Sequence, residues 1–443
     1  MPGAEALTQP AAVVDEGDAP GVNRAHPVHV YVHVVLVALL GAVAVLVWLV
    51  VFETLTKLLW ENDLVTANPW LAPAICLPFS LAVGLLVKYR NAPTNLDESL
   101  LDTLSGDLGK VMWRRLPVNI LQAWASLLSG AVLGPEGAIG GISSKLAMLY
   151  AEKMGIAAEE RPRLVFATIG SAYNGLVASP LFAGVLATEI EPDPATRGRT
   201  LPANLIGGAI GFLVFEMAGT TGLQDYLHLA GGATLRPVDM GLVVVFGLLG
   251  MVMAILTGLL FRVAASVFGR LEGREVERAL IAGVIFSAVG IFAPILLFSG
   301  ETQILEVLAD PAAYGPGILL AMAAAKLALL AVAFKSGFLG GPVFPSIFAS
   351  VCVALAIDAI FPGIPIEVLI GGIMAGFLMV LFKAPFMVIL LTVVMLQADP
   401  NLTALIVLAV AAVMVAQPYV VAAIAARGTG TAAGAAAGAR PGR

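Results

Sequence analysis

Long apolar runs set the pattern of this chain. Three stretches, 240–261, 279–300 and 402–426, carry no charged side chain over 22, 22 and 25 residues. A helix needs about 20 apolar residues to cross the hydrocarbon of a bilayer, so each stretch predicts a plain spanning helix. The run 33–52 predicts another, because it lacks the short basic start that leads into the apolar core of a signal peptide.

Other apolar segments are shorter, or are interrupted by Gly and Pro. A lipid-exposed backbone cannot leave its hydrogen-bonding groups unpaired, so a broken helix at membrane depth must be buried in protein or line a polar cavity. These segments therefore predict a transport site. They are 116–131, 136–150, 164–178, 179–188, 343–357 and 384–397.

The breaks recur in the two halves of the chain. A Gly-Pro pair at 134–135 is followed 45 residues later by Ser-Pro at 179–180, and a Gly-Pro pair at 341–342 is followed 43 residues later by Ala-Pro at 384–385. Two repeats with the site between them are usual in secondary transporters. The pattern favours an all-α integral membrane protein of two inverted-topology helical repeats with broken, re-entrant helices. Chance similarity among Gly-rich membrane helices is the alternative.

Composition supports a membrane protein and narrows the chemistry. Only 12% of the 443 residues are charged, 59% are hydrophobic and the mean hydropathy is +0.95, so most of the surface must face something other than water. The net charge of −6 and the lack of a Lys/Arg-rich run disfavour nucleic acid as a partner. Cys76 and Cys352 stand alone in apolar runs and only four His are present, so no metal site is expected.

The charge and hydropathy pattern divides the chain into three parts. Residues 1–27 and 428–443 are predicted to be disordered tails, and 28–427 a transmembrane domain with repeats at about 70–220 and 240–427. No soluble domain is expected after the membrane part, and the basic loops favour a cytoplasmic N-terminus.

Glu136 is the sharpest chemical feature. It is a lone carboxylate flanked by Gly134, Gly137, Gly140 and Gly141. An ionisable side chain in such a segment is costly unless it faces a bundle interior or a water-filled path. Glycines let backbone N–H groups approach an anion closely, and the same donors would hold the carboxylate itself when no anion is bound. Protonation would release them and couple protons to anions. A helix-start carboxylate that caps its own helix at the membrane surface is the alternative.

A second Gly-rich turn, 336–348, predicts matching donors from the other repeat. Gly340 and Gly341 precede a Pro-limited helix start, where the N–H groups of Val343 and Phe344 are free. A tight turn used only for helix packing is the alternative.

Four further side chains stand out. Glu189 and Glu191 end an apolar segment and are candidates for proton uptake, or are simply solvated acids before a Pro-containing loop. The Tyr419 hydroxyl follows a spanning helix and can donate to an anion in a pore or lie at the membrane interface. Lys326 is expected to snorkel to the interface, without a role. No phosphate-binding loop or nucleophilic triad is visible, so an enzyme is not expected.

Together these segments resemble the CLC family of chloride channels and proton-coupled anion antiporters. VLGPEGAIGG is similar to that family's GxEGP segment and SGFLGGPVFP to its GxFxP segment. YNGLVASPLFAGVLATEIE resembles its helix ending in acidic residues, and AQPYVV its C-terminal helix with the pore tyrosine. The four occur in the right order over roughly residues 30–427.

The resemblance implies roles for individual residues. Glu136 would be the gating glutamate that competes with the anion, and Glu189 or Glu191, depending on the alignment, the internal proton-transfer acid. The implied anion-binding positions are Gly134, Pro135, Gly137, Gly341, Val343, Phe344 and, through its hydroxyl at the central site, Tyr419.

The resemblance also implies a homodimer with one pore per subunit in a bacterial inner membrane. No cofactor is expected beyond the transported chloride and H⁺, and no C-terminal nucleotide-binding regulatory pair is expected.

Two departures from the family leave the anion open among chloride, nitrate and fluoride. Ala138 and Ile139 stand where the family has Pro-Thr, and Ala92, Pro93 or Thr94 stands where its central serine should be. We predict a transporter of a small monovalent anion, first of all chloride, in exchange for protons. A passive voltage- or pH-gated anion channel and a non-conducting family member with a structural role are the alternatives.

Overall fold

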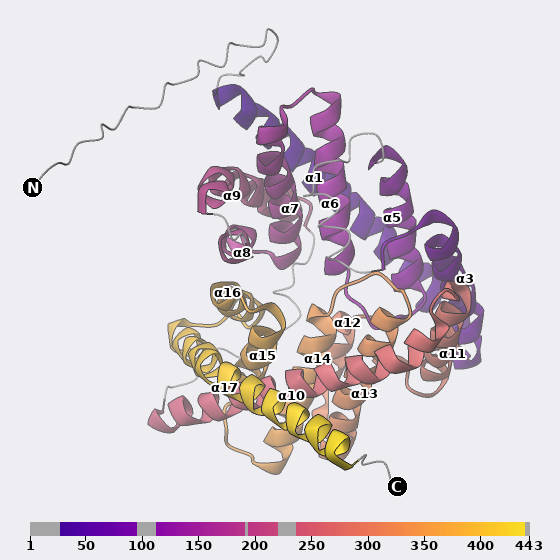
Figure 1. Ribbon diagram of the computed structural model, residues 1–443, viewed down its shortest axis with the longest axis vertical. Coiled ribbons are helices and arrows are strands. Elements are labelled where there is room, and N and C mark those ends of the chain that lie inside the picture. The colour runs from indigo at the N-terminus through magenta and orange to yellow at the C-terminus, as the bar shows by residue number, and fades with distance from the viewer. Residues whose placement is uncertain (1–26, 95–111, 191–193, 220–235, 439–443) are drawn as a thin grey trace, which may run out of the picture.

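A computed structural model describes residues 27–94, 112–190, 194–219 and 236–438. These residues form a bundle of helices, and the described chain contains no β-strand beyond a single backbone bridge between two glycines (Figure 1). The α-helices are α1 (Pro27–Trp60), α2 (Asp63–Ala67), α3 (Ala72–Arg90), α5 (Met112–Leu128), α6 (Glu136–Lys153), α7 (Arg161–Val177), α8 (Phe182–Ile190), α9 (Pro194–Met217), α10 (Pro237–Phe268), α11 (Glu275–Phe292), α12 (Glu301–Ala309), α13 (Gly315–Lys335), α14 (Val343–Ile360), α15 (Ile366–Phe382), α16 (Pro385–Met395) and α17 (Pro400–Gly438). Short 3₁₀ turns include η5 (Pro294–Leu296).

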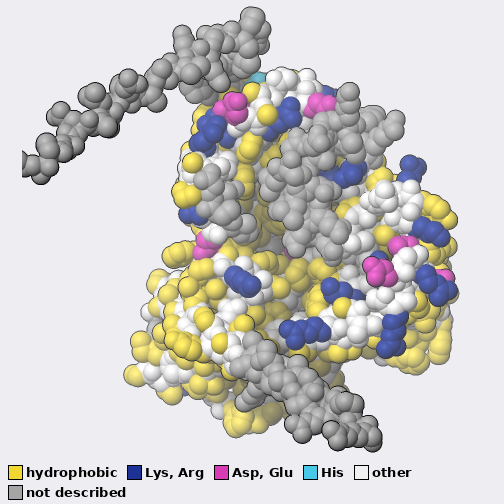
Figure 2. Space-filling view, in the orientation of Figure 1, with side chains coloured by type: hydrophobic (Ala, Val, Ile, Leu, Met, Phe, Trp, Pro, Cys, Tyr) yellow, Lys and Arg dark blue, Asp and Glu magenta, His cyan; other side chains and the backbone are white. Residues whose placement is uncertain are grey.

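The fold is that of a multi-pass membrane protein. Within the described residues, seven helices are long and apolar enough to cross a bilayer, beginning with His29–Trp60 and ending with Pro400–Ile424. Many of their side chains point outward, among them Val47, Val263 and Met414, and hydrophobic side chains cover much of the surface in Figure 2. Such a surface is stable only against lipid or another protein.

The predicted pair of repeats is confirmed. In the first half, α5, α6, α7 and α8 follow one another as a long helix, a helix that begins just after Gly-Pro, a third helix and a short helix after a Pro. In the second half α13, α14, α15 and α16 follow in the same order. Figure 1 shows the two groups facing each other, and α8 meets α16 between them.

Glycines bring the helices of each half into backbone contact. A Cβ added at Gly211 of α9 would lie 1.8 Å from the carbonyl oxygen of Ser171 in α7. In the second half, a Cβ at Gly376 of α15 would lie 1.9 Å from the carbonyl oxygen of Gly247 in α10. In a bilayer the hydrophobic effect does not drive helices together. Small residues let the helices approach closely, and the resulting van der Waals packing stabilises their association.

Basic residues gather at one end of the molecule. Lys88 and Arg90 end α3, which runs antiparallel to α11 and ends where α11 begins, near Arg274. Lys335 ends α13 at the same end. At the N-terminal end of α1, Tyr31 packs against the guanidinium of Arg163, near the start of α7. The cytoplasmic N-terminus expected from the basic loops stays a prediction.

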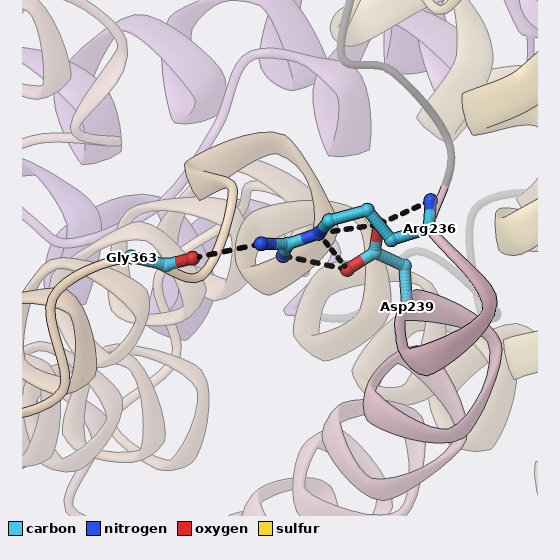
Figure 3. Close-up of polar contacts among 3 residues, drawn as sticks. All are labelled: Arg236, Asp239 and Gly363. Atoms are coloured by element: carbon cyan, nitrogen blue, oxygen red, sulfur yellow. Dashed lines mark hydrogen bonds and ion pairs between the residues drawn. The ribbon is translucent and has the colours of Figure 1, made fainter.

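A salt bridge lies at the start of α10, at the other end of the molecule from Lys335. Arg236, just before α10, binds the carboxylate of Asp239 at 2.8 Å, and its Nη1 donates to the carbonyl oxygen of Gly363 at 3.2 Å (Figure 3). Gly363 lies in the turn between α14 and α15, so this arginine ties the start of α10 to that turn.

Two predicted boundaries are wrong. The stretch 279–300 is not one spanning helix, because α11 ends at Phe292 and the chain breaks at Pro294, a residue that cannot continue a helix into the next turn. The helix α17 continues to Gly438, through most of the segment 428–443 predicted as a tail, since its Ala-rich sequence favours helix. Residues 1–26 of the other predicted tail lie outside the described residues.

Candidate functional site

The two Gly-rich turns meet at the centre of the molecule. The N–H of Gly134 donates to the carbonyl of Gly341, and the N–H of Gly341 donates back to the carbonyl of Gly134, both at 2.8 Å. A Cβ at Gly137 would lie 2.1 Å from the carbonyl carbon of Gly340, so only glycine permits this approach. The N-termini of α6 and α14 thus converge, and each directs unpaired N–H groups and the positive end of a helix dipole to one place.

The side chain of Glu136 lies where the N-termini of α6 and α14 converge. Its side chain is 7% exposed, and its Oε1 accepts a hydrogen bond from the N–H of Val343 at 2.8 Å. The backbone amides of Phe344 and of Glu136 itself also face the carboxylate. Its second oxygen, Oε2, is buried without a hydrogen-bond partner in the described part of the chain. A carboxylate from one repeat therefore occupies the helix start of the other, where free N–H groups and the helix dipole favour a negative charge.

Gly134 and Gly341 lie directly against the carboxylate of Glu136. A Cβ at Gly134 would lie 1.8 Å from Oε2 of Glu136, and a Cβ at Gly341 would lie 2.3 Å from its Oε1. Any larger residue at either position would expel the carboxylate. The Gly-rich pattern in the sequence is thus required by the space around one side chain.

Polar side chains of neighbouring helices hold the two turns. Tyr173 of α7 donates its hydroxyl to the carbonyl of Glu136 at 2.8 Å. On α5, Ser126 accepts the N–H of Leu339 at 2.9 Å, and Gln122 donates to the carbonyl of Gly337 at 3.0 Å. None of these three residues was predicted from the sequence. Their signal was a polar group within an apolar helix, but their partners are far away in the sequence.

Glu189 has a different environment. At the end of α8, its Oε1 accepts the N–H of Phe386 at 2.9 Å and its Oε2 accepts the N–H of Met387 at 2.8 Å. Both carboxylate oxygens therefore cap the N-terminus of α16. The start of α8 is fixed by Asn174, whose Oδ1 accepts the N–H of Ala183 at 2.6 Å. Glu191 lies outside the described residues.

A cavity of about 820 Å³ opens beside Glu136, against the C-terminal half of α1. It reaches Pro135, next to Glu136, and its walls come from α1, α12 and the break after α11. Polar side chains of α1 and α12 line it, including Glu53, Lys57 and Glu301. Because Glu53 and Lys57 are exposed, the cavity opens to the surface.

Comparison with known proteins agrees with this architecture. A model of the family described as "Voltage gated chloride channel" matches residues 79–417. The chain belongs to the voltage-gated chloride channel, or CLC, family. "Putative ion-transport protein YfeO" of Escherichia fergusonii is 25% identical over 369 residues, covering 79% of this chain and 84% of that protein. The protein of the same name from Salmonella schwarzengrund is 26% identical over 349 residues, covering 76% and 80%.

Solved CLC structures share the fold. A CLC-type fluoride/proton antiporter superposes with a TM-score of 0.68 at 19% identity, over 88% of this chain and 96% of that one. A eukaryotic CLC transporter superposes with a TM-score of 0.64 at 16% identity, over 88% and 72%. This chain is thus a multi-pass ion-transport protein of the CLC family, and its bacterial relatives indicate a bacterial inner membrane.

The structure does not bring Tyr419 to the CLC site. Its side chain is 75% exposed, because α17 continues through Pro418 as one helix and turns this side chain outward. Thr94, one of the residues considered for the central hydroxyl, lies beside the second Gly-rich turn. Thr94 Cγ2 would lie 3.7 Å from a Cβ at Gly337, the first residue of the second Gly-rich turn after α13 and Ser336.

Three predicted anion donors need correction. The N–H groups of Gly134 and Gly341 bind each other's carbonyls, so they are not open to an anion. Pro135 has no N–H and contributes the wall of the cavity instead. Of the predicted positions, Gly137, Val343 and Phe344 remain at or next to the converging helix starts, and the N–H of Val343 is the one held by Glu136.

The prediction for Lys326 is wrong. It does not snorkel but lies fully buried in the middle of α13. Its Nζ donates to the carbonyls of Leu296 and Leu297, at 3.2 and 2.9 Å, and lies 4.6 Å from the ring centroid of Phe348. The carbonyls freed by the break after α11 attract this ammonium, and no sequence pattern identifies them in advance.

Proposed function

We propose that this CLC protein exchanges a small monovalent anion, first of all chloride, for protons, and that Glu136 is both the gate and the proton carrier. The observation that carries the proposal is the position of its carboxylate. One oxygen binds the N–H of Val343 at the start of α14, and the other is buried without a partner among the described residues.

Competition follows from charge. An ionised Glu136 and a transported anion need the same N–H donors, and two negative charges at one helix start repel each other. A protonated Glu136 is neutral and binds those donors weakly, so it leaves and an anion takes its place. Each return of the carboxylate to the donors releases a proton on one side and expels the anion, which links the two fluxes.

The titles of structural neighbours lend support. One of them is a fluoride/proton antiporter, although the sequence identity is only 19%. The proposed cycle uses chloride and protons, requires no cofactor or metal, and makes this protein a transporter and not an enzyme.

A passive anion channel is the second candidate, and Glu189 is the observation that favours it. Both of its oxygens accept backbone N–H groups at the N-terminus of α16, which fixes the carboxylate between the repeats. An exchanger needs either a release of this cap or another internal acid.

A homodimer is part of the proposal. The face formed by α8, α9, α16 and α17 exposes large apolar side chains, including Leu181, Leu213, Phe386 and Met414. These helices lie on one side of the molecule in Figure 1. A second copy would cover this face as lipid does, and no regulatory nucleotide-binding domain is required.

Flux measurements in liposomes test the function. Purified protein is reconstituted, and anion efflux and external pH are recorded together under chloride, nitrate and fluoride gradients in turn. We expect protons to move uphill when an anion gradient is imposed, and Glu136→Gln to abolish proton movement while anion flux continues. Anion flux without proton movement in the native protein would favour the channel. No flux of any of the three anions would favour a non-conducting protein.

A further inference from the structure

The cavity outside Glu136 has an unexpected charge for an anion pathway. Among the described residues that line it, Glu53, Glu61, Glu301 and Glu306 face a single lysine, Lys57. Acidic side chains repel anions and raise the local concentration of protons. The lining is therefore better suited to collecting protons than to attracting the transported anion.

Glu301 is the member of this group that is built into the site. It begins α12, after Gly300, whose φ of +104° only glycine adopts readily. A Cβ at Gly300 would lie 3.0 Å from Phe348 of α14. Phe348 follows Val343, which holds Glu136, by five residues, or about 7.5 Å along the helix. Glu301 is thus anchored between one and two turns outward of the N–H that binds Glu136.

The packing around Gly300 is rigid. The ring of Phe348 supports the ammonium of Lys326 on one side, and Lys326 in turn binds the carbonyls of Leu296 and Leu297 just before Gly300. These contacts hold the backbone that leads into α12, from which Glu301 extends, against α13 and α14.

Glu301 is also half-buried and electrostatically linked to Glu136. The hydroxyl of Ser299 donates to its Oε1 at 3.0 Å, and its charge is repelled by Glu136 and Glu53 and attracted by Lys326. The nine-residue helix α12 is too short to cross a bilayer by itself. Burial, followed by repulsion from Glu136, raises the pKa of Glu301 to about 8. A carboxyl group of this kind gains and loses a proton near neutral pH.

We propose that Glu301 is a second proton-handling carboxylate, which takes protons from the outer cavity and passes them to Glu136. This inference rests on the proton exchange proposed above. In each step the O–H bond of Glu301 breaks as the O–H bond of Glu136 forms, directly or through water, and Glu301 regains a proton from the cavity. Two carboxylates that repel each other favour a single shared proton, so transfer between them is nearly balanced in energy.

Other charged and titratable groups around Glu301 influence this transfer. Glu53, Lys57 and Glu61 face the cavity from α1, and Glu306 faces it from α12. Lys326, from α13, and Glu136, from α6, are the buried neighbours, and the Tyr314 hydroxyl at the start of α13 is bound to Glu306 at 3.3 Å.

The test compares two glutamates of the same helix. Glu301→Gln and the control Glu306→Gln remove the same charge from the same cavity, but Glu306 is exposed and bound to Tyr314. Each protein is reconstituted in liposomes with the same pH on both sides, from 6.0 to 8.5, and proton and chloride fluxes are measured together. Equal pH makes the result independent of how the protein is oriented in the vesicle. Anion flux reports that a variant is folded.

We expect Glu301→Gln to lower proton flux on the order of tenfold, with anion flux retained and the loss greatest at the alkaline end. Glu306→Gln should match the native protein, and Glu301→Asp should restore part of the proton flux. An unchanged ratio of proton to anion flux in Glu301→Gln would overturn the inference. If the native protein moves no protons at all, the proposed exchange fails first, and this result is distinct from a failure of Glu301 alone.

A second variant decides the case in which Glu301→Gln does not fold. Ser299→Ala keeps the carboxylate but removes the hydroxyl that donates to it. Because that donor favours the ionised form, its loss should move the pH profile of proton flux to higher pH, by roughly half a unit. A profile that does not move would contradict the role of Glu301.

Discussion

Glu136 and Glu189 both extend from the first repeat to a helix start of the second, but they are held in different ways. Glu136 has one oxygen on the N–H of Val343 and one buried oxygen without a partner among the described residues. Glu189 has both oxygens on backbone N–H groups, of Phe386 and Met387. The first carboxylate is incompletely satisfied and tightly enclosed, and the second is fully satisfied.

The difference teaches which acid can move. A buried oxygen without a hydrogen bond costs free energy, so Glu136 gains by leaving or by taking up a proton. Glu189 loses two charge-assisted hydrogen bonds if it leaves, and α16 loses its cap. In the proposed exchange, the same motif, a carboxylate at a helix start, serves as a gate in one place, while in the other it links the two repeats.

Gly341→Ala should have the largest effect, because it displaces Glu136 and leaves Glu189 in place. The new Cβ would lie 2.3 Å from the Oε1 of Glu136, so the carboxylate must leave its place. We expect proton coupling to fall roughly tenfold or more while anion flux continues, measured in liposomes. Gly258→Ala is the matched control, since its Cβ has nothing within 4 Å. Normal coupling in Gly341→Ala would show that Glu136 does not need this enclosure.

Lys326→Met tests a buried charge whose hydrogen bonds, like those of Glu189, are made to backbone groups. The substitution leaves the carbonyls of Leu296 and Leu297 without their donor. We expect the free energy of unfolding to fall by about 2–4 kcal/mol, seen as a lower Tm in detergent. Lys57→Met, at an exposed position, is the control. An unchanged Tm would mean that water replaces the ammonium without cost.

Glu189→Gln tests whether the second carboxylate only links the repeats or also carries protons. Glutamine retains one oxygen for the N-terminus of α16 but has no charge to interact with the helix dipole. A loss of about 1–2 kcal/mol in stability, measured as a lower Tm, is expected. If this variant also stops proton movement at full anion flux, Glu189 carries protons and its cap must open during the cycle. If coupling is unchanged, Glu189 only links the repeats.

Tyr419→Phe should have the smallest effect. Its side chain lies on the surface of α17, away from the converging helix starts, so loss of the hydroxyl should change stability by less than about 0.5 kcal/mol. Chloride affinity, measured by calorimetry, should also be unchanged. A clear loss of affinity would place this hydroxyl in the anion pathway after all.

Local signals made part of this site predictable from the sequence. A lone acid in an apolar segment indicates function wherever it occurs, and Gly-Pro pairs end helices whatever surrounds them. Glu136 and the short helices α6, α14 and α16 follow from such rules. The order of the breaks was enough to predict two repeats.

Residues whose partners are distant in the chain could not be predicted. In the sequence nothing distinguishes Lys326 from other lysines in apolar runs. Its partners are two carbonyls freed by the break after Phe292, and only the fold brings them to it. Glu301 follows what seemed a plain spanning helix, and Pro294 was the overlooked signal that the helix ends early. Tyr173 and Ser126 have roles only because α5 and α7 pack beside the two turns.

Competition between Glu136 and the anion is the central claim, and calorimetric titration of chloride at pH 5.5 and pH 8 tests it most directly. Protonation removes the carboxylate from the N–H of Val343, so the native protein should bind chloride more tightly at the lower pH. Glu136→Ala should bind tightly at both pH values, because the competitor is gone. Equal affinity of the native protein at the two pH values, or the same pH dependence in Glu136→Ala, would contradict the account.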